Sequence, residues 1–184
     1  MARTLTLLLC ALCLSACKNE DPAPLYFKAD YQLRCGGCTP RVSDEPERNI
    51  EMVEGEEGGT MSCSVENIGG RDVLSFDFVR DVAGSNDDYG FRIRQIDVES
   101  KAPGSACRVR ATEGSNAFEG KCKSPGDDGK ETCEIEIEVS GETVTGSVYC
   151  NDVPDSETGY TRDLVRPGTA DKPVEFEIFG CRGL

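Results

Sequence analysis

The sequence has no histidine among its 184 residues, and this absence removes several kinds of site at once. Ser-His and Cys-His nucleophile pairs need an imidazole as general base, and no metal centre can include an imidazole ligand. A sustained helical stripe is also missing, and 20 glycines and 9 prolines interrupt the chain. We therefore expect an all-β protein without a histidine-based catalytic or metal site.

Positive charge is scarce as well, because 34 acidic residues face 20 basic ones and the formal net charge is −14. A chain of this charge repels phosphate backbones and anionic headgroups. No nucleic acid partner is expected. The acidic surplus otherwise indicates a solvated surface.

The N-terminus has the three parts of an export signal. Arg3 supplies positive charge, residues 4–14 form an apolar run too short to span a bilayer, and small residues follow. This pattern predicts a signal peptide over residues 1–16. Three cysteines lie in or beside the run, but without histidine, and with the apolar run in lipid, they do not suggest a metal site.

The motif Leu14-Ser15-Ala16-Cys17 resembles the lipobox of bacterial lipoproteins. The resemblance implies that a peptidase cleaves before Cys17, that Cys17 is lipidated, and that Cys10 and Cys13 are discarded. The protein would then be held to a membrane through its lipidated N-terminus. Lys18 follows the cysteine, and in the Gram-negative sorting pattern a residue other than Asp there implies the outer membrane of the bacterial cell envelope.

The mature chain is expected to be a tether over residues 17–24 followed by a single β-rich domain over residues 25–184. The tether is polar and contains two prolines, which is typical of a linker. Period-two alternation is followed from Met61 onward, and residues 25–60 are expected to form an irregular N-terminal part.

Eight cysteines remain in the mature domain, and an even number in an exported chain predicts four disulfides. The Cys-Gly-Gly-Cys spacing of the first two is also found in redox motifs. A redox motif needs a helix N-terminus, which two glycines oppose, so a structural role is favoured. The disulfide candidates are Cys35, Cys38, Cys63, Cys107, Cys122, Cys133, Cys150 and Cys181.

Two hairpins have a predicted register. Folding CEIEIEVSGETVTGSVYC on Gly141-Glu142, which suits a type II′ turn, places Cys133 opposite Cys150. Folding CRVRATEGSNAFEGKC on Gly114-Ser115 places Cys107 opposite Cys122. A bridge within each hairpin is the first choice, and a bridge from Cys150 to Cys181 is the alternative.

Further strands follow from period-two alternation. Residues 61–66 and 73–79 form a pair, residues 89–98 change face near Gln95 and predict a bulge there, and residues 172–181 supply a last strand. The expected fold is an all-β, disulfide-stapled antiparallel β-sandwich, or flattened barrel, of about eight strands.

Residues 142–181, with the hairpin GETVTGSVYC and the strand KPVEFEIFGC, are similar to the mycobacterial LpqH-type lipoprotein antigens. The resemblance covers about a quarter of the mature chain and implies a lipid-anchored β-sandwich at the cell surface. It also favours the Cys150 to Cys181 pairing. The eight cysteines depart from that family.

Acidic residues offer two further possibilities. Acidic loops at residues 85–88, 126–129 and 151–157 carry oxygen ligands of the kind calcium takes, although none matches the twelve-residue calcium loop and such residues are ordinary in turns. Glu134, Glu136 and Glu138 point outward at strand spacing, as on a solvated face. No cofactor, metal or catalytic residue is assigned.

The leading hypothesis is a lipid-anchored cell-envelope protein, not an enzyme, that acts as a binding or structural module. Its partner would be an envelope protein or polymer. The alternative is a hydrolase of envelope polymers that uses a carboxylate pair. A concave site with two inward carboxylates would favour the enzyme, and flat sheets with outward acids would favour the module.

Overall fold

The computed structural model describes residues 23–36, 43–56, 58–81, 87–123 and 133–184. Those ranges contain strands, turns and loops but no helix, so none of them holds a helix that could cross a membrane. The strands are β1 (Tyr26–Arg34), β2 (Arg48–Val53), β3 (Thr60–Ile68), β4 (Arg71–Arg80), β5 (Tyr89–Asp97), β6 (Ala102–Glu113), β7 (Asn116–Lys121), β8 (Cys133–Ser140), β9 (Thr143–Pro154), β10 (Thr161–Val165) and β11 (Val174–Phe179).

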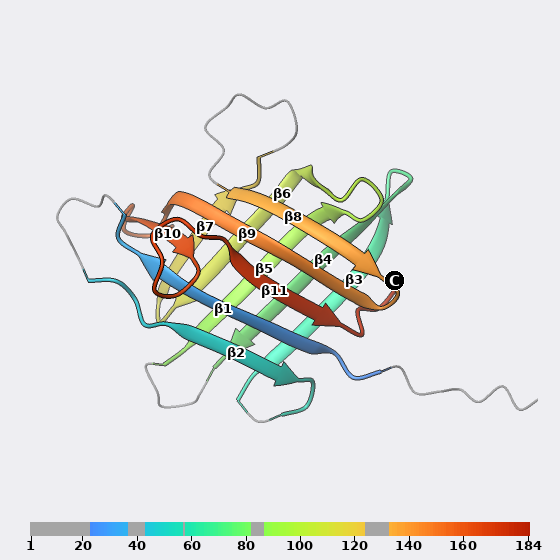
Figure 1. Cartoon of the computed structure of the whole chain (residues 1–184), viewed down its shortest axis with the longest axis horizontal. Coiled ribbons are helices and arrows are strands. Elements are labelled where there is room, and N and C mark those ends of the chain that lie inside the picture. The colour runs from blue at the N-terminus through green and yellow to red at the C-terminus, as the bar shows by residue number, and fades with distance from the viewer. Residues whose placement is uncertain (1–22, 37–42, 57, 82–86, 124–132) are drawn as a thin grey trace, which may run out of the picture.

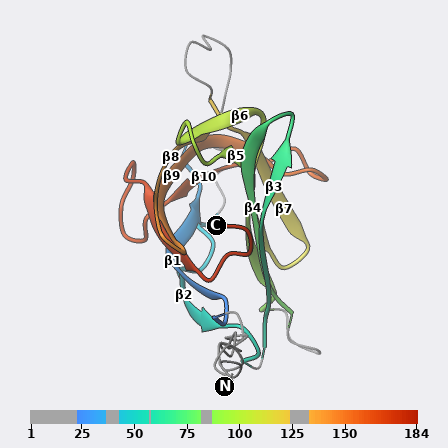
Figure 2. The same ribbon diagram turned by 90° about the vertical axis from the view of Figure 1, so that its right-hand side faces the viewer.

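The strands form two antiparallel sheets. Sheet B has the order β3-β4-β5-β6-β7, and sheet A has the order β10-β1-β11-β9-β8 with β2 paired to β1. Strands β10 and β11 pair in succession with both β1 and β9, so they lie end to end between those two longer strands. Sheet A lies in front of sheet B and its strands cross those of sheet B steeply (Figure 1). The edge-on view shows the two layers (Figure 2).

Alternation along each strand sends one side chain in two into the space between the sheets. On β1 the inward residues Phe27, Tyr31 and Leu33 are fully buried. The Phe27 ring lies 4.4 Å from that of Phe76 on β4, measured between centroids. The core is therefore an aromatic layer that joins the first strand of sheet A to the centre of sheet B.

Short links join the sheets at their edges. The disulfide Cys63–Cys181 ties β3 to the segment after β11, where the backbone N–H of Val65 donates to the carbonyl of Arg182 at 2.8 Å. At the other edge, the N–H of Lys123 donates to the carbonyl of Cys133 at 2.7 Å. The predicted sandwich is confirmed, and these links give it some of the character of a flattened barrel.

Both hairpins have the predicted register. Cys133 faces Cys150 at a Cα separation of 4.0 Å and is bonded to it, and Cys107 is bonded to Cys122. Gly141 has a positive φ of 59°, as the first central position of a type II′ turn requires. The alternative bridge from Cys150 to Cys181 is wrong, because Cys181 bonds to Cys63 instead.

The predicted bulge is also present. Gln95 has a φ of 60°, and the pairing of β5 with β6 shifts register between Arg94 and Ile96. The extra residue lets Phe91 and Ile93 on one side of the bulge, and Ile96 on the other, all face the core.

The expectation of an irregular part over residues 25–60 is wrong. It contains β1 and β2, and β1 is a central strand of sheet A. With β10 as a further unpredicted strand, the described residues hold eleven strands rather than about eight. The β1 segment does alternate, with outward Lys28 and Asp30 between buried residues, but it lacks the paired turn signals that marked the hairpins.

Candidate functional site: two faces of opposite charge

The outer face of sheet A carries most of its charge as carboxylates. Pairing across β1, β11, β9 and β8 aligns Lys28, Glu177, Thr145 and Glu138 in one row. The next row holds Glu175, Ser147 and Glu136 on β11, β9 and β8. As predicted, Glu134, Glu136 and Glu138 are exposed on the side of β8 that faces away from the core.

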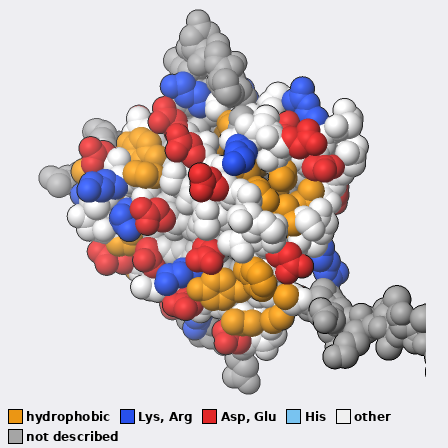
Figure 3. Space-filling view, turned by 45° about the vertical axis from the view of Figure 1, so that its right-hand side comes forward, with side chains coloured by type: hydrophobic (Ala, Val, Ile, Leu, Met, Phe, Trp, Pro, Cys, Tyr) orange, Lys and Arg blue, Asp and Glu red, His pale blue; other side chains and the backbone are white. Residues whose placement is uncertain are grey.

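These rows line a groove with a volume of about 800 Å³, which we call the acidic groove. Three cationic residues, Lys28, Lys101 and Arg166, also line it, and Arg166 is paired with Glu175 at 3.0 Å. Carboxylates are spread over much of the face seen in Figure 3. The acidic residues that line the groove are Asp30, Glu136, Glu138, Glu175 and Glu177.

One carboxylate in the acidic groove has an unused acceptor. The Oδ1 atom of Asp30 is shielded from solvent and accepts no hydrogen bond from the described residues. Within those residues, no cation forms an ion pair with Glu136, Glu138 or Glu177. A ligand that carries N–H donors and positive charge would satisfy both conditions.

The outer face of sheet B is basic although the whole chain is strongly acidic. Arg92 lies directly opposite Arg110, Arg94 opposite Arg108, and Arg108 opposite Lys121. We call these five residues on β5, β6 and β7 the basic face. Asp77 on β4 and Glu119 on β7 stand at its two sides.

A hollow of about 290 Å³ adjoins the basic face, and its walls include Arg92, Arg110 and Thr112 together with the acidic residues Asp77, Asp81 and Asp88. Arg92 forms an ion pair with Asp77. The Nε atom of Arg92 is nevertheless shielded from solvent and donates no hydrogen bond to the described residues. The hollow thus presents one unused donor.

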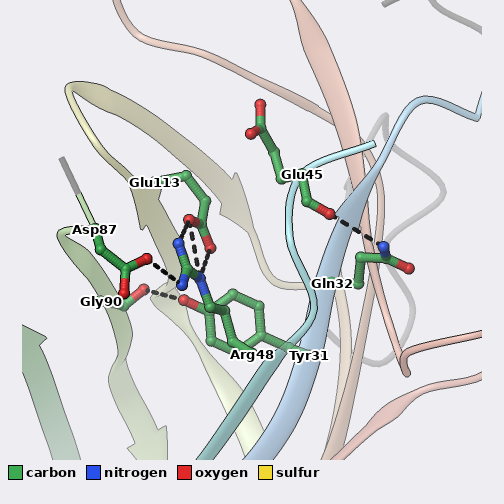
Figure 4. Close-up of polar contacts among 7 residues, drawn as sticks. All are labelled: Tyr31, Gln32, Glu45, Arg48, Asp87, Gly90 and Glu113. Carbon is green, nitrogen blue, oxygen red and sulfur yellow. Dashed lines mark hydrogen bonds and ion pairs between the residues drawn. The ribbon is translucent and has the colours of Figure 1, made fainter. Parts of the chain in front are cut away.

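A third polar cluster lies between the sheets (Figure 4). Arg48 on β2 donates to Glu113 on β6 through Nε at 2.9 Å and through Nη2 at 2.6 Å. Its Nη1 pairs with Asp87 at 2.6 Å, and its guanidinium stacks over the Tyr89 ring at 4.3 Å. The hydroxyl of Tyr31 donates to the carbonyl of Gly90 at 3.2 Å. These contacts connect sheet A to sheet B.

The contacts of the cluster around Arg48 and Glu113 indicate a structural role, not a catalytic one. Hydrogen bonds to Glu113 raise the pKa of Arg48, while burial raises the pKa of Glu113 and Arg48 partly offsets that effect. Burial also raises the pKa of Tyr31 well above its ordinary value. Arg48 donates hydrogen bonds to both carboxylate oxygens of Glu113, so this carboxylate is not positioned to exchange a proton with a substrate.

Asp155 lies in one of the acidic loops considered for calcium, and both of its carboxylate oxygens accept hydrogen bonds from the protein. Its Oδ1 accepts the N–H groups of Glu157 and Thr158 and the Thr158 hydroxyl, and its Oδ2 accepts the N–H of Ala117 on β7 at 2.9 Å. Among the described residues, no cluster of three or more metal-ligating side chains is present. The loop at residues 126–129 and residues 85 and 86 lie outside them.

We expect Asp155→Asn to lower the free energy of unfolding by roughly 2 kcal/mol. In one orientation the amide NH₂ would face the N–H of Ala117, and in the other it would face the N–H groups of Glu157 and Thr158. Burial alone would raise the pKa of Asp155, but the accepted hydrogen bonds outweigh it and hold the pKa below the ordinary 3.8. A lowered pKa in the folded state adds stability above the unfolded value, and this is lost as pH falls through the folded value.

Urea unfolding of Asp155→Asn at pH 7 and at pH 3 measures both effects. The deficit relative to wild type should be larger at pH 7 than at pH 3. Glu157→Gln, which changes an exposed neighbour that contributes only its backbone to the network, is the control. An equal deficit at both pH values would show that the charge of Asp155 is not involved.

Of the predicted lipidation and disulfide cysteines, some lie in the described residues and others do not. Cys17 and Cys38 lie outside the described residues, and Cys35 is disulfide-bonded. The basic face was missed. Its signal was present in the alternation of Phe91-Arg92-Ile93-Arg94 and Arg108-Val109-Arg110, where every outward position is arginine.

No protein-family profile, curated protein or solved structure matches the chain. The site must therefore be interpreted from its own geometry.

Proposed function

We propose that the protein is a lipid-anchored module of the bacterial cell envelope that binds a partner without catalysing a reaction. The acidic groove binds a cationic segment of that partner, such as a lysine-rich or arginine-rich polypeptide. The observation that carries this proposal is the solvent-shielded Oδ1 of Asp30, an unused acceptor in a groove where Glu136, Glu138 and Glu177 form no ion pair with the described residues.

The exposure of the carboxylates favours binding over catalysis. A general acid needs a carboxyl group whose pKa is raised, usually by removal from water. Burial raises the pKa of Glu113 and of Asp163, and neither residue lines the groove. Glu136, Glu138 and Glu175 are exposed. Such carboxylates provide attraction and hydrogen bonds at little desolvation cost.

The anchoring part of the proposal rests on the sequence and on the disulfides. The described residues contain three bonded cysteine pairs, which are typical of a protein exported from a reducing compartment. The signal pattern and the lipobox-like motif end at Cys17, six residues before the first described residue, Ala23. A short tether of this kind would keep the domain close to the membrane.

Cys17→Ser should prevent lipidation and cleavage, because the acyl-accepting thiol is lost. We expect the variant to appear as an uncleaved precursor or a soluble species that leaves the detergent phase in Triton X-114 partitioning. The control is Ser15→Ala, which keeps the small residue and the thiol. Unchanged partitioning of Cys17→Ser would contradict lipid anchoring at this residue.

Binding to the groove can be measured with a fluorescent oligolysine at low salt. Neutralising three groove carboxylates in Asp30→Asn/Glu136→Gln/Glu138→Gln should weaken binding about tenfold, at roughly 0.5 kcal/mol for each exposed charge lost. Glu66→Gln/Glu119→Gln/Asp81→Asn removes three exposed acids of sheet B and its adjoining loop and should have a much smaller effect. Equal losses in the two variants would mean that net charge, not the groove, determines binding.

A hydrolase remains the second candidate because of one observation. Glu138 and Glu177 lie in the same row on strands separated by β9, which places their backbones about 9.6 Å apart across a concave surface. Inverting glycosidases use carboxyl groups roughly 6.5 to 9.5 Å apart. Release of reducing ends from purified envelope glycans by wild type, and its loss in Glu138→Gln, would support this candidate and contradict the binding module.

A further inference from the structure

We propose that the basic face is a second binding surface, which docks an extended anionic polymer carrying phosphate groups. This surface is on the opposite sheet from the acidic groove and does not depend on what the groove binds. Three observations carry the proposal: the like-charged pairing of its residues, the unused Nε donor of Arg92 beside it, and its position in a strongly acidic molecule.

The pairing of like charges on the basic face costs stability. Cross-strand neighbours lie directly opposite one another, and like charges in such positions are destabilising. Here two successive rows pair arginine with arginine, Arg92 with Arg110 and Arg94 with Arg108. Among the described residues, no carboxylate forms an ion pair with Arg94, Arg108 or Arg110. An anion bound across the rows would remove this repulsion.

The hollow beside the rows supplies a hydrogen-bond donor for the same ligand. The Nε atom of Arg92 is shielded and donates no hydrogen bond to the described residues, and Thr112 lines the same hollow. Arginine N–H groups recognise phosphate oxygens, so the unused Nε of Arg92 is suited to such a ligand. The hollow of about 290 Å³ has room for one such group.

The spacing of the cations suits a chain of repeated charges. Neighbouring strands lie about 4.8 Å apart, and alternate residues on one strand lie about 6.7 Å apart. Arg94, Arg108 and Lys121 form a line across β5, β6 and β7, and Arg92 and Arg110 form a second line beside it. A polymer with a charge on each repeat can follow either line.

A thin polymer fits the charge distribution better than a lipid surface does. Asp77 and Glu119 stand at the sides of the basic face, and the whole chain has a net charge of −14. A membrane broad enough to cover the face would also meet those acids and the surrounding negative surface, which repel it. A chain lying along the arginine rows meets mainly the cations.

The test uses the full-length protein in detergent and fluorescently labelled long-chain inorganic polyphosphate as probe. Arg94→Gln/Arg108→Gln should weaken binding at least tenfold and lower the slope of log affinity against log salt by about one to two, as expected when two phosphate contacts are lost. Lys28→Gln/Arg71→Gln removes two exposed cations outside the face and should change neither quantity measurably.

Thermal unfolding distinguishes a binding role from a structural one. Because Arg94→Gln/Arg108→Gln removes like-charge repulsion, its Tm should equal or exceed that of wild type. A lower Tm together with the lost binding would indicate that the arginines hold the sheet together. Arg110→Gln then serves as the second variant, and its unchanged polyphosphate affinity would overturn the proposal.

Two other results would also overturn it. Wild-type binding to vesicles of anionic lipid, with none to polyphosphate, would identify a membrane surface as the partner. Salt-sensitive self-association that disappears in Arg94→Gln/Arg108→Gln would show that the face holds the acidic groove of a second copy. Oligolysine binding to the acidic groove is measured separately from polyphosphate binding to the basic face. The proposed function can therefore fail without affecting the test of this proposal, and the reverse.

Discussion

Replacing Cys63 and Cys181 by alanine is expected to lower the free energy of unfolding by about 5 kcal/mol. The bridge joins residues 118 apart in sequence, and in the chain-entropy model a cross-link that closes a loop of this length restricts the unfolded chain most. Both cysteines are buried. Their loss should also loosen the edge of sheet B, where Val65 donates to Arg182 beside the bridge.

The hairpin bridge Cys107–Cys122 provides a matched control, because it joins residues only 15 apart in sequence. Cys107→Ala/Cys122→Ala should cost about 3 kcal/mol in the same model. Urea unfolding of both variants without reductant gives the two free energies. The m-value should rise more for Cys63→Ala/Cys181→Ala, since its unfolded chain expands more. A larger cost for the hairpin bridge would contradict the loop-length argument.

The two hairpins were predictable because everything that defines them is local. A glycine that allows a positive φ, alternating apolar residues and two facing cysteines all lie within 18 residues, as in Cys133 to Cys150. The order of the strands was not predictable in this way. Strand β1 pairs with β2, β10 and β11, and its partners in β10 and β11 lie more than 120 residues away. Nothing in the local pattern specifies such pairings.

The same distinction applies to the candidate sites. The outward direction of Glu134, Glu136 and Glu138 followed from alternation. The meeting of Glu136 and Glu138 with Glu175 and Glu177 in one groove required the order β11-β9-β8. The net charge of −14 led to the expectation that phosphate polymers would be repelled. That expectation averages over the molecule, whereas the sheets separate the charges by face.

The buried ion pair between the sheets was beyond sequence reasoning, because Arg48 and Glu113 are 65 residues apart and each looks like a surface residue of a strand. In the structure, the exposed fractions of their side chains are 11% and 4%. Removing two charges from water has a desolvation cost that offsets much of the attraction between them. Removing one partner leaves the other charge uncompensated.

We therefore expect Glu113→Ala to lower the free energy of unfolding by about 3 to 5 kcal/mol, because Arg48 would keep its charge between the sheets with Asp87, which is 59% exposed, as its remaining acidic partner. Arg48→Met/Glu113→Leu, which replaces both charges by apolar groups of similar size, should recover most of the loss. Chemical unfolding of Arg48→Met, Glu113→Leu and their double variant gives the coupling energy between the two positions.

The pair Lys28 and Glu51 is the control for this measurement, since it also joins residues on neighbouring elements but is 49% and 60% exposed. Lys28→Gln and Glu51→Gln should each change stability by less than about 1 kcal/mol. If Glu113→Ala cost no more than Glu51→Gln, the interior pair would contribute nothing to holding the sheets together. A double variant no more stable than Glu113→Ala would instead show that packing around Tyr31 and Tyr89, rather than uncompensated charge, causes the loss.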